Sequence, residues 1–220
     1  MSLNSNNLPT GGGGNIDPME PGTYPARVAC VIDLGMQTQN AYQGKEKPPV
    51  NMIAFTYEFV DEFLKDEEGE NIEDKPRWLT EMMPMYGLGA DKAKSTARYM
   101  ALDPKLIFKG DFQHLAGEPC LVTVVHNPNK KTGGVYENIG GITSMRAKDA
   151  DDTPPLVSGS KVFDMDTPDL DVFNSLPPFV QKKIMGGLEY EGSALYALVG
   201  NGNGAAKPAD EEKLDDENPY

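Results

Sequence analysis

The chain has 220 residues, of which 39% are hydrophobic and 8% aromatic, and its formal net charge is −14. This length and composition provide for one large domain with a packed core and tails. The polar opening lacks the regions of a signal peptide, and no apolar run approaches the ~18 residues that span a bilayer, so a cytoplasmic protein is expected. Cys30 and Cys120 lie in apolar runs, which predicts buried, reduced thiols.

The first third of the chain predicts two strands. Residues 1–20 are polar and glycine-rich, and we interpret them as a disordered lead. Residues 23–35 form the first predicted strand, with one face made of Tyr24, Ala26, Val28, Cys30 and Ile32. Gly35 marks a bulge or bend in it. Residues 51–60 form the second strand, with one face made of Ile53, Phe55, Tyr57 and Phe59.

A long insertion, about residues 61–115, separates these strands from the rest of the sheet. It opens with an acidic hairpin tip over residues 61–74 and a short returning strand over 77–80. A helix is predicted to begin at Asp91, whose side chain can cap it, and to stop before Pro104. One face of this helix carries residues one turn apart, Lys94 and Arg98.

The sheet then resumes and the chain closes with helices and a tail. Strands are predicted over 118–126 and 135–145, with a break or bulge at Gly140-Gly141. A helix follows over about 168–186, and its apolar stripe consists of Leu176, Val180 and Ile184. Residues 199–220 are interpreted as a flexible linker and an acidic tail.

The order of these elements predicts the fold class. Helices do not alternate with consecutive strands, which argues against a parallel sheet. We expect a mainly β protein with inserted and appended helices (α+β), built as an OB-type five-stranded antiparallel barrel over residues 21–198. A sandwich or jelly roll is the alternative.

Enzymatic chemistry has little support in the sequence. Two histidines and two distant cysteines make no zinc signature, and no phosphate-binding loop or nucleophile elbow is present. The acidic run over 164–171 lacks the pattern of a calcium loop and suits the start of a helix better. No enzyme activity, metal or cofactor is therefore expected.

Charge is segregated along the chain. Residues 75–148 contain eleven Lys and Arg against six Asp and Glu, with aromatic residues interleaved among them. Single-stranded nucleic acid is bound by this combination, because cations follow the phosphates and aromatic faces stack on bases. The candidate phosphate contacts are Lys92, Lys94, Arg98, Lys130, Lys131 and Arg146, with Lys45 and Lys47 of the first loop as weaker additions. The candidate stacking residues are Trp78, Tyr99 and Tyr136, with Tyr42 as a weaker addition, although such aromatics can also be core residues.

An acidic run with an aromatic residue follows the linker. It contains Asp210, Glu211, Glu212, Asp215, Asp216, Glu217 and Tyr220. Such a segment can dock into a basic pocket of a partner protein, with its ring buried and its carboxylates paired. It can also cover the protein's own basic groove, or simply keep the chain soluble.

Several stretches carry a resemblance to a known family. DDENPY resembles the acidic tip of bacterial and phage single-stranded DNA-binding proteins, which usually end in Phe rather than Tyr. The body is similar to phage-encoded members in TYPARVACVIDLG, KPPVNMIAFTYEFVDEF, KPRWLTE, GADKAKSTARYMALDP and VFNSLPPFVQKKIMGGLEYEGS.

The resemblance implies a function as well as a fold. It implies an OB fold, oligomeric coating of single strands in replication, recombination or repair, and no enzymatic activity. It also implies recruitment of polymerase, helicase-primase or a recombinase through the tail, in the cytoplasm of an infected bacterium. A phage structural or assembly protein with a β-barrel core, and an acidic DNA mimic that inhibits a host nuclease, are the alternatives.

Overall fold

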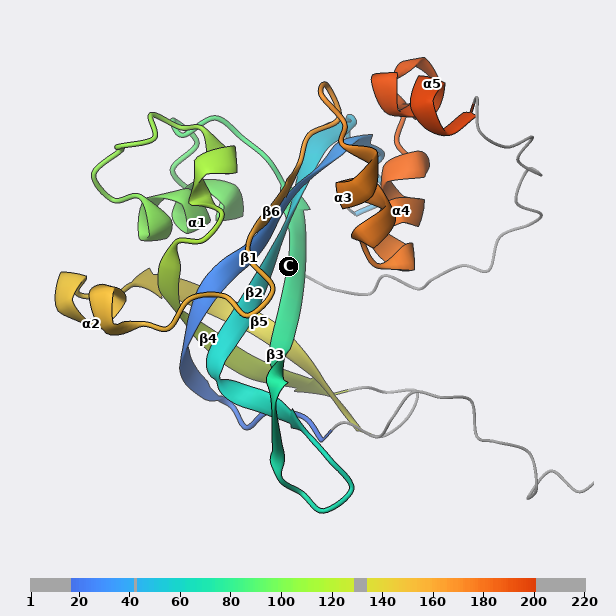
Figure 1. Cartoon of the computed structure of the whole chain (residues 1–220). Coiled ribbons are helices and arrows are strands. Elements are labelled where there is room, and N and C mark those ends of the chain that lie inside the picture. The colour runs from blue at the N-terminus through green and yellow to red at the C-terminus, as the bar shows by residue number, and fades with distance from the viewer. Residues whose placement is uncertain (1–16, 42, 129–133, 201–220) are drawn as a thin grey trace, which may run out of the picture.

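One six-stranded sheet, covered by short helices, organises the chain (Figure 1). The computed structural model describes residues 17–41, 43–128 and 134–200. The strands are β1 (Gly22–Gln37), β2 (Val50–Lys65), β3 (Asn71–Pro84), β4 (Pro119–Pro128), β5 (Val135–Ser144) and β6 (Lys161–Phe163). The helices are α1 (Lys94–Leu102), α2 (Ala147–Asp152), α3 (Leu170–Ser175), α4 (Pro178–Met185) and α5 (Ala194–Gly200), with 3₁₀ turns η2 (Phe112–Leu115) and η3 (Tyr190–Gly192).

The strand order is β3-β2-β1-β4-β5, and every neighbouring pair on this path is antiparallel. The mainly β architecture with inserted and appended helices is therefore as predicted. β6, which was not predicted, pairs in parallel with β1 at Cys30–Ile32, beyond the point where β4 stops pairing. β3 is also much longer than the predicted strand at 77–80. The described residues form one sheet rather than the two of a sandwich, and its ladder does not close between β3 and β5.

The alternation of side chains along β1 reverses part-way along its length. Its register against β2 shifts between Val28 and Cys30. Val28 therefore packs with one hydrophobic core, whereas Cys30 and Ile32 pack with another on the opposite face. The prediction that Tyr24 to Ile32 share one face was wrong, because one extra residue in a strand reverses the direction of every later side chain.

The first core lies on the inner face of the sheet. Ile53, Phe55, Tyr57 and Phe59 of β2 all belong to it, which confirms the predicted alternation. α1 and η2 cover the end of this core with Tyr99, Leu102 and Leu115. The helix begins at Lys94 rather than at Asp91, and no side chain caps it. Burial raises the pKa of the Cys120 thiol in this core to about 12, so the thiol stays protonated.

The second core lies on the outer face of the sheet. β6, α3, α4 and α5 cover β1 and β2 there, and the predicted stripe of Leu176, Val180 and Ile184 is buried in it. The helix predicted over 168–186 is two helices, because Leu176-Pro177 interrupts it. Cys30 is a buried free thiol of this core. No helix in the described ranges is long and apolar enough to span a membrane.

Side chains bridge the open edges of β3 and β5. Arg77 of β3 binds both carboxylate oxygens of Glu137 of β5, at 2.9 and 3.0 Å. Residues 17–20, assigned above to the disordered lead, pack here: Met19 is buried and its amide donates to Glu137. His126 Nε2 lies 2.7 Å from the carbonyl oxygen of Met19. Polar contacts thus hold together two strands that share no backbone ladder. The rest of the predicted lead, residues 1–16, lies outside the described ranges.

Glycine is required at one bulge of β5. Gly140 is left out of the register between β4 and β5, at the predicted position, and a Cβ atom there would lie 2.8 Å from Cγ1 of Val125. We expect Gly140→Ala to lower the free energy of unfolding by about 1–3 kcal/mol, because the β-branched Val125 cannot move away easily. Urea denaturation measures this loss.

Gly141 is the matched control for this prediction. A Cβ atom at Gly141 meets nothing within 4 Å. Gly141→Ala should therefore leave the free energy of unfolding within about 0.5 kcal/mol of the wild type. Equal losses in the two variants would contradict the steric explanation.

Candidate nucleic-acid interface

The two basic residues predicted on one face of α1 do share a face, but they bind a carboxylate of β3. Arg98 Nε and Nη2 donate to Glu81 at 2.7 and 3.0 Å, and Lys94 Nζ lies 2.9 Å from Glu81 Oε2. Arg98 is only 6% exposed. Arg98 is therefore not available to contact phosphate, contrary to the prediction, because it is buried under the helix and Glu81 neutralises its charge. The Lys94 side chain remains 46% exposed, with its charge paired.

Glu81 is the centre of this buried cluster. Tyr57 of β2 also donates to it, from Oη to Oε1 at 2.9 Å. Burial alone would raise the pKa of Glu81, but the hydrogen bonds and positive charges of Arg98 and Lys94 outweigh burial and lower the pKa. The carboxylate thus stays ionised inside the protein, where it fixes α1 against the sheet.

Tyr99 is also a structural residue. It is 0% exposed, and its hydroxyl donates to Asp103 and accepts from the amide of Gly110. Asp103 in turn accepts from the amides of Ile107 and Phe108, so the pair shapes the loop that follows α1. Tyr99 is therefore not available to stack on a base, contrary to the prediction, because neither face of its ring reaches solvent.

Trp78 of β3 remains available to a ligand. It is 41% exposed on the outer face, and its Nε1 donates to Glu58 Oε2 of β2 at 2.9 Å. Opposite Glu58 on β1 stands Arg27, so the three side chains form one row across three strands. This hydrogen bond fixes the indole orientation while leaving much of the ring open to solvent.

The same row holds a segment that crosses the outer face, residues 153–157, which we call the strap (Figure 1). Arg27 donates to the carbonyl oxygens of Thr153 and Pro154, each at 2.7 Å. Glu58, which is almost fully buried, accepts from the amide of Val157 at 2.7 Å. Trp78 therefore lies at the border between the strap and the uncovered outer face.

Arg27 and Glu58 were not identified from the sequence as residues that shape this surface. The available signal was a charged residue within a mainly apolar stretch of each of the two strands, at a position where burial requires a partner. The partners themselves lie about a hundred residues away in the chain, so their identity was not readable from spacing.

Tyr136 of β5 also lies on the outer face. Its neighbour Glu137 reaches inward to Arg77, so by strand alternation Tyr136 is directed outward, and it is exposed. Tyr136 pairs with Asn127 next to the β4–β5 turn. Lys130 and Lys131 of that turn lie outside the described residues, as do Tyr42 and the acidic run from Asp210 to Tyr220.

The remaining candidate cations are dispersed. Lys45 and Lys47 belong to the β1–β2 loop, which follows Gln37 at one end of β1. The β4–β5 turn is adjacent to the other end of β1, because Gly22 pairs with Val124. Lys92 is exposed before α1, and Arg146 is an exposed residue whose guanidinium binds Asp149. The candidate cations that lie within the described residues are therefore not gathered into one patch.

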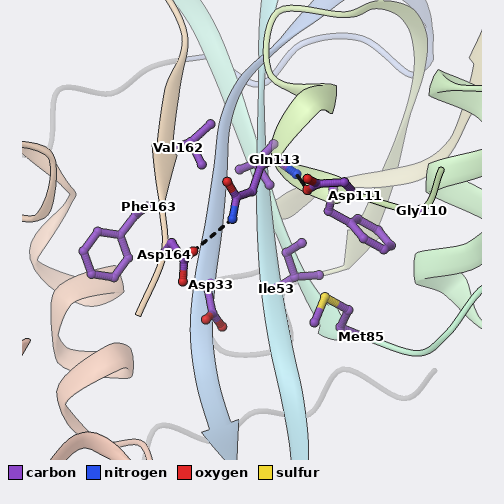
Figure 2. Close-up of a pocket in the computed structure, with 11 residues that line it drawn as sticks. Asp33, Ile53, Met85, Gly110, Asp111, Gln113, Val162, Phe163 and Asp164 are labelled. Atoms are coloured by element: carbon purple, nitrogen blue, oxygen red, sulfur yellow. Dashed lines mark hydrogen bonds between the residues drawn. The ribbon is translucent and has the colours of Figure 1, made fainter. Parts of the chain in front are cut away.

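A small cavity lies between the η2 loop and β6 (Figure 2). Its volume is about 250 Å³, and three carboxylates line it, those of Asp33, Asp111 and Asp164. Gln113 crosses it to donate to Asp164 at 2.9 Å. Burial, with smaller contributions from Asp164 and Asp166, raises the pKa of Asp33. Such a cavity repels phosphate, and among the described residues no three carboxylate, histidine or cysteine side chains are placed so that they could hold a metal ion together.

Comparisons with protein-family models, with curated proteins and with solved structures each found no match to this chain. A proposal about its function therefore depends on its own topology and side chains.

The pairing of Arg98 with Glu81 yields a stability prediction. Arg98→Met should lower the free energy of unfolding by about 3–5 kcal/mol, because it leaves a buried carboxylate without its main partner. Lys94→Met is the control, and it should cost at most about 1 kcal/mol since Lys94 is half exposed. Urea denaturation at neutral pH separates the two, and equal losses would contradict a dominant role of the buried pair.

The same cluster yields a pH prediction. The pKa of Glu81 is lower in the folded chain than in the unfolded one, so its stabilisation is present above the unfolded pKa of about 4.3 and is lost as pH falls through the folded value. The stability gap between wild type and Arg98→Met should therefore narrow as pH falls from 7 toward the lowest pH at which both still fold. A gap that does not change with pH would contradict this assignment.

Proposed function

We propose that this chain binds single-stranded DNA without sequence preference, through an OB-type barrel. The observation that carries the proposal is the topology: strand order β3-β2-β1-β4-β5, with α1 inserted between β3 and β4 and packed across the end of the inner core. OB barrels are partly open Greek-key barrels that bind oligonucleotides on the face of strands 2 and 3 and with the loops 1–2 and 4–5. The contact of Arg77 with Glu137 supports closure of the barrel by side chains.

The proposed interface is the part of the outer face that the C-terminal helices leave uncovered. Trp78 of β3 and Tyr136 of β5 offer exposed rings there, next to the residues Arg77 and Glu137 that join these two strands. Rings of this kind stack on bases of any sequence, each contributing ~1–3 kcal/mol. Lys130 and Lys131, in the turn that follows Asn127 and precedes Tyr136, supply the proposed phosphate contacts. Lys45, Lys47 and Lys92 are secondary contacts.

The distribution of charge separates the proposed DNA-binding surface from the proposed partner-binding tail. The net charge of −14 disfavours non-specific contact with duplex DNA, so binding depends on local cations and stacking. The segment 210–220 combines six acids with Tyr220, and we propose that it recruits replication or recombination proteins rather than DNA. Polymerase, helicase-primase and a recombinase are the candidate partners.

Trp78 is the single tryptophan of the chain, so its fluorescence reports on the proposed interface directly. Titration with oligo-dT should quench that fluorescence, because a base stacks on the exposed indole. In anisotropy titrations with labelled oligo-dT, Trp78→Ala should bind about tenfold more weakly. Lys130→Ala with Lys131→Ala should lower the slope of log affinity against log salt by ~0.7 for each lost phosphate contact.

Tyr86 provides the matched aromatic control. Its ring is about as exposed as that of Trp78 but lies after the end of β3, outside the proposed interface. Tyr86→Ala should leave oligo-dT affinity unchanged, and circular dichroism checks that each variant is folded. Absence of oligo-dT binding by the wild type at low salt would overturn the proposal and favour an assembly protein with a β-barrel core.

A further inference from the structure

The end of the β2–β3 hairpin projects from the sheet as an acidic arm, residues 61–74 (Figure 1). The pairing of β2 with β1 reaches only to Phe59, so the arm is two-stranded. Irregular pairing between Glu58 and Phe63 separates it from the regular ladder. Isolated two-stranded hairpins are marginally stable in water, so a projecting arm of this kind gains from a partner surface.

The arm presents ordered negative charge. It contains eight acids and one lysine. Asp66 Oδ1 accepts from the amides of Glu68 and Glu70, each at 2.9 Å, and this fixes the tip. The side chains of Glu67 and Glu68 are exposed and form no ion pair among the described residues. The tip therefore presents its carboxylates from a backbone turn that Asp66 holds in place.

A surface of opposite character lies on α4. Val180 and Ile184 face the second core, which leaves Phe179, Lys182, Lys183 and Met185 on the other sides of the helix; we call these four residues the α4 face. Phe179 is 57% exposed and Met185 is also exposed. In the described part of the chain, neither lysine forms an ion pair. Exposed apolar side chains next to unpaired cations are typical of a docking surface.

The two surfaces lie at opposite ends of the molecule. The side-chain amide of Gln37 donates from Nε2 to the carbonyl oxygen of Lys183, so α4 is adjacent to the end of β1. This end of β1 pairs with the start of β2, where Gln37 is opposite Val50. The acidic arm is the other end of β2, roughly 45 Å away along a strand of this length. One copy therefore cannot join its own arm to its own α4 face.

We propose that the acidic arm of one copy docks on the α4 face of a second copy. The contact joins two different surfaces, so it is heterologous and builds an open chain of subunits rather than a closed dimer. Although each copy carries −14, charges separated by more than the ~8 Å Debye length of physiological salt are screened, and the local pairing of Glu67 and Glu68 with Lys182 and Lys183 dominates the contact. The proposal does not depend on DNA binding.

Charge reversal tests the contact in the absence of DNA. Sedimentation velocity of the full chain from about 5 to about 500 µM should show concentration-dependent association. Glu67→Lys with Glu68→Lys, and separately Lys182→Glu with Lys183→Glu, should each weaken self-association at least about tenfold, because like charges then meet. Mixing these two variants should restore association, since every arm then meets an α4 face of opposite charge.

Controls distinguish this contact from a general effect of charge. Asp151→Lys with Asp152→Lys changes the net charge as the arm variant does, on exposed residues of α2, and it should associate as the wild type. A wild type that stays monomeric, or mixed variants that remain dissociated, would overturn the proposal. So would an α4 variant that loses oligo-dT affinity but associates normally, because the α4 face would then bind nucleic acid.

Discussion

At Ala29 the pairing between β1 and β2 shifts by one residue, and every second side chain of β1 consequently faces opposite sides of the sheet before and after the shift. Ala26 and Val28, before the shift, belong to the core under α1, whereas Cys30 and Ile32, which continue the same alternation after it, belong to the core under α3, α4 and α5. The same region is where β4 leaves β1 and β6 replaces it. One central strand thereby contributes to two cores, and the helices that pack on each core contact a different set of its side chains.

Burial on both faces limits where a ligand can bind. The inner face is filled by α1 and its cluster around Glu81, and the outer face is covered near β6 by the C-terminal helices. Within the described part of the chain, the stretch of outer face that begins at Trp78, along the strap, is left uncovered. Arg27 and Glu58 each satisfy backbone groups of the strap region, so buried charge here defines the limits of the surface on which the proposed function depends.

Prediction from sequence succeeded where one face of an element is apolar and failed where both are. The alternation from Ile53 to Phe59 could be predicted because large apolar side chains occupy every second position there, and these are the ones that pack into the inner core. The run from Ala26 to Leu34 is apolar at nearly every position, so no alternation within it could reveal a register shift. The bulge at Gly140 was readable because glycine has a specific backbone role there.

The candidate site was harder to predict than the fold. Helix spacing correctly placed Lys94 and Arg98 together, but spacing does not reveal what a face packs against. The partner, Glu81, is on a strand whose full length was not predicted. Trp78 is exposed, although nothing in its own stretch of sequence distinguishes it from a core tryptophan, and its stacking role stays a prediction.

The two free cysteines have a practical consequence. Cys120 belongs to the inner core and Cys30 to the outer core, and the chain contains no other cysteine. A thiol reagent reaches each one only after its own core opens, since burial keeps both thiols protonated and covered. The relative labelling rates of the two thiols under native conditions therefore report whether the two cores open as one cooperative unit or separately, with no engineered probe.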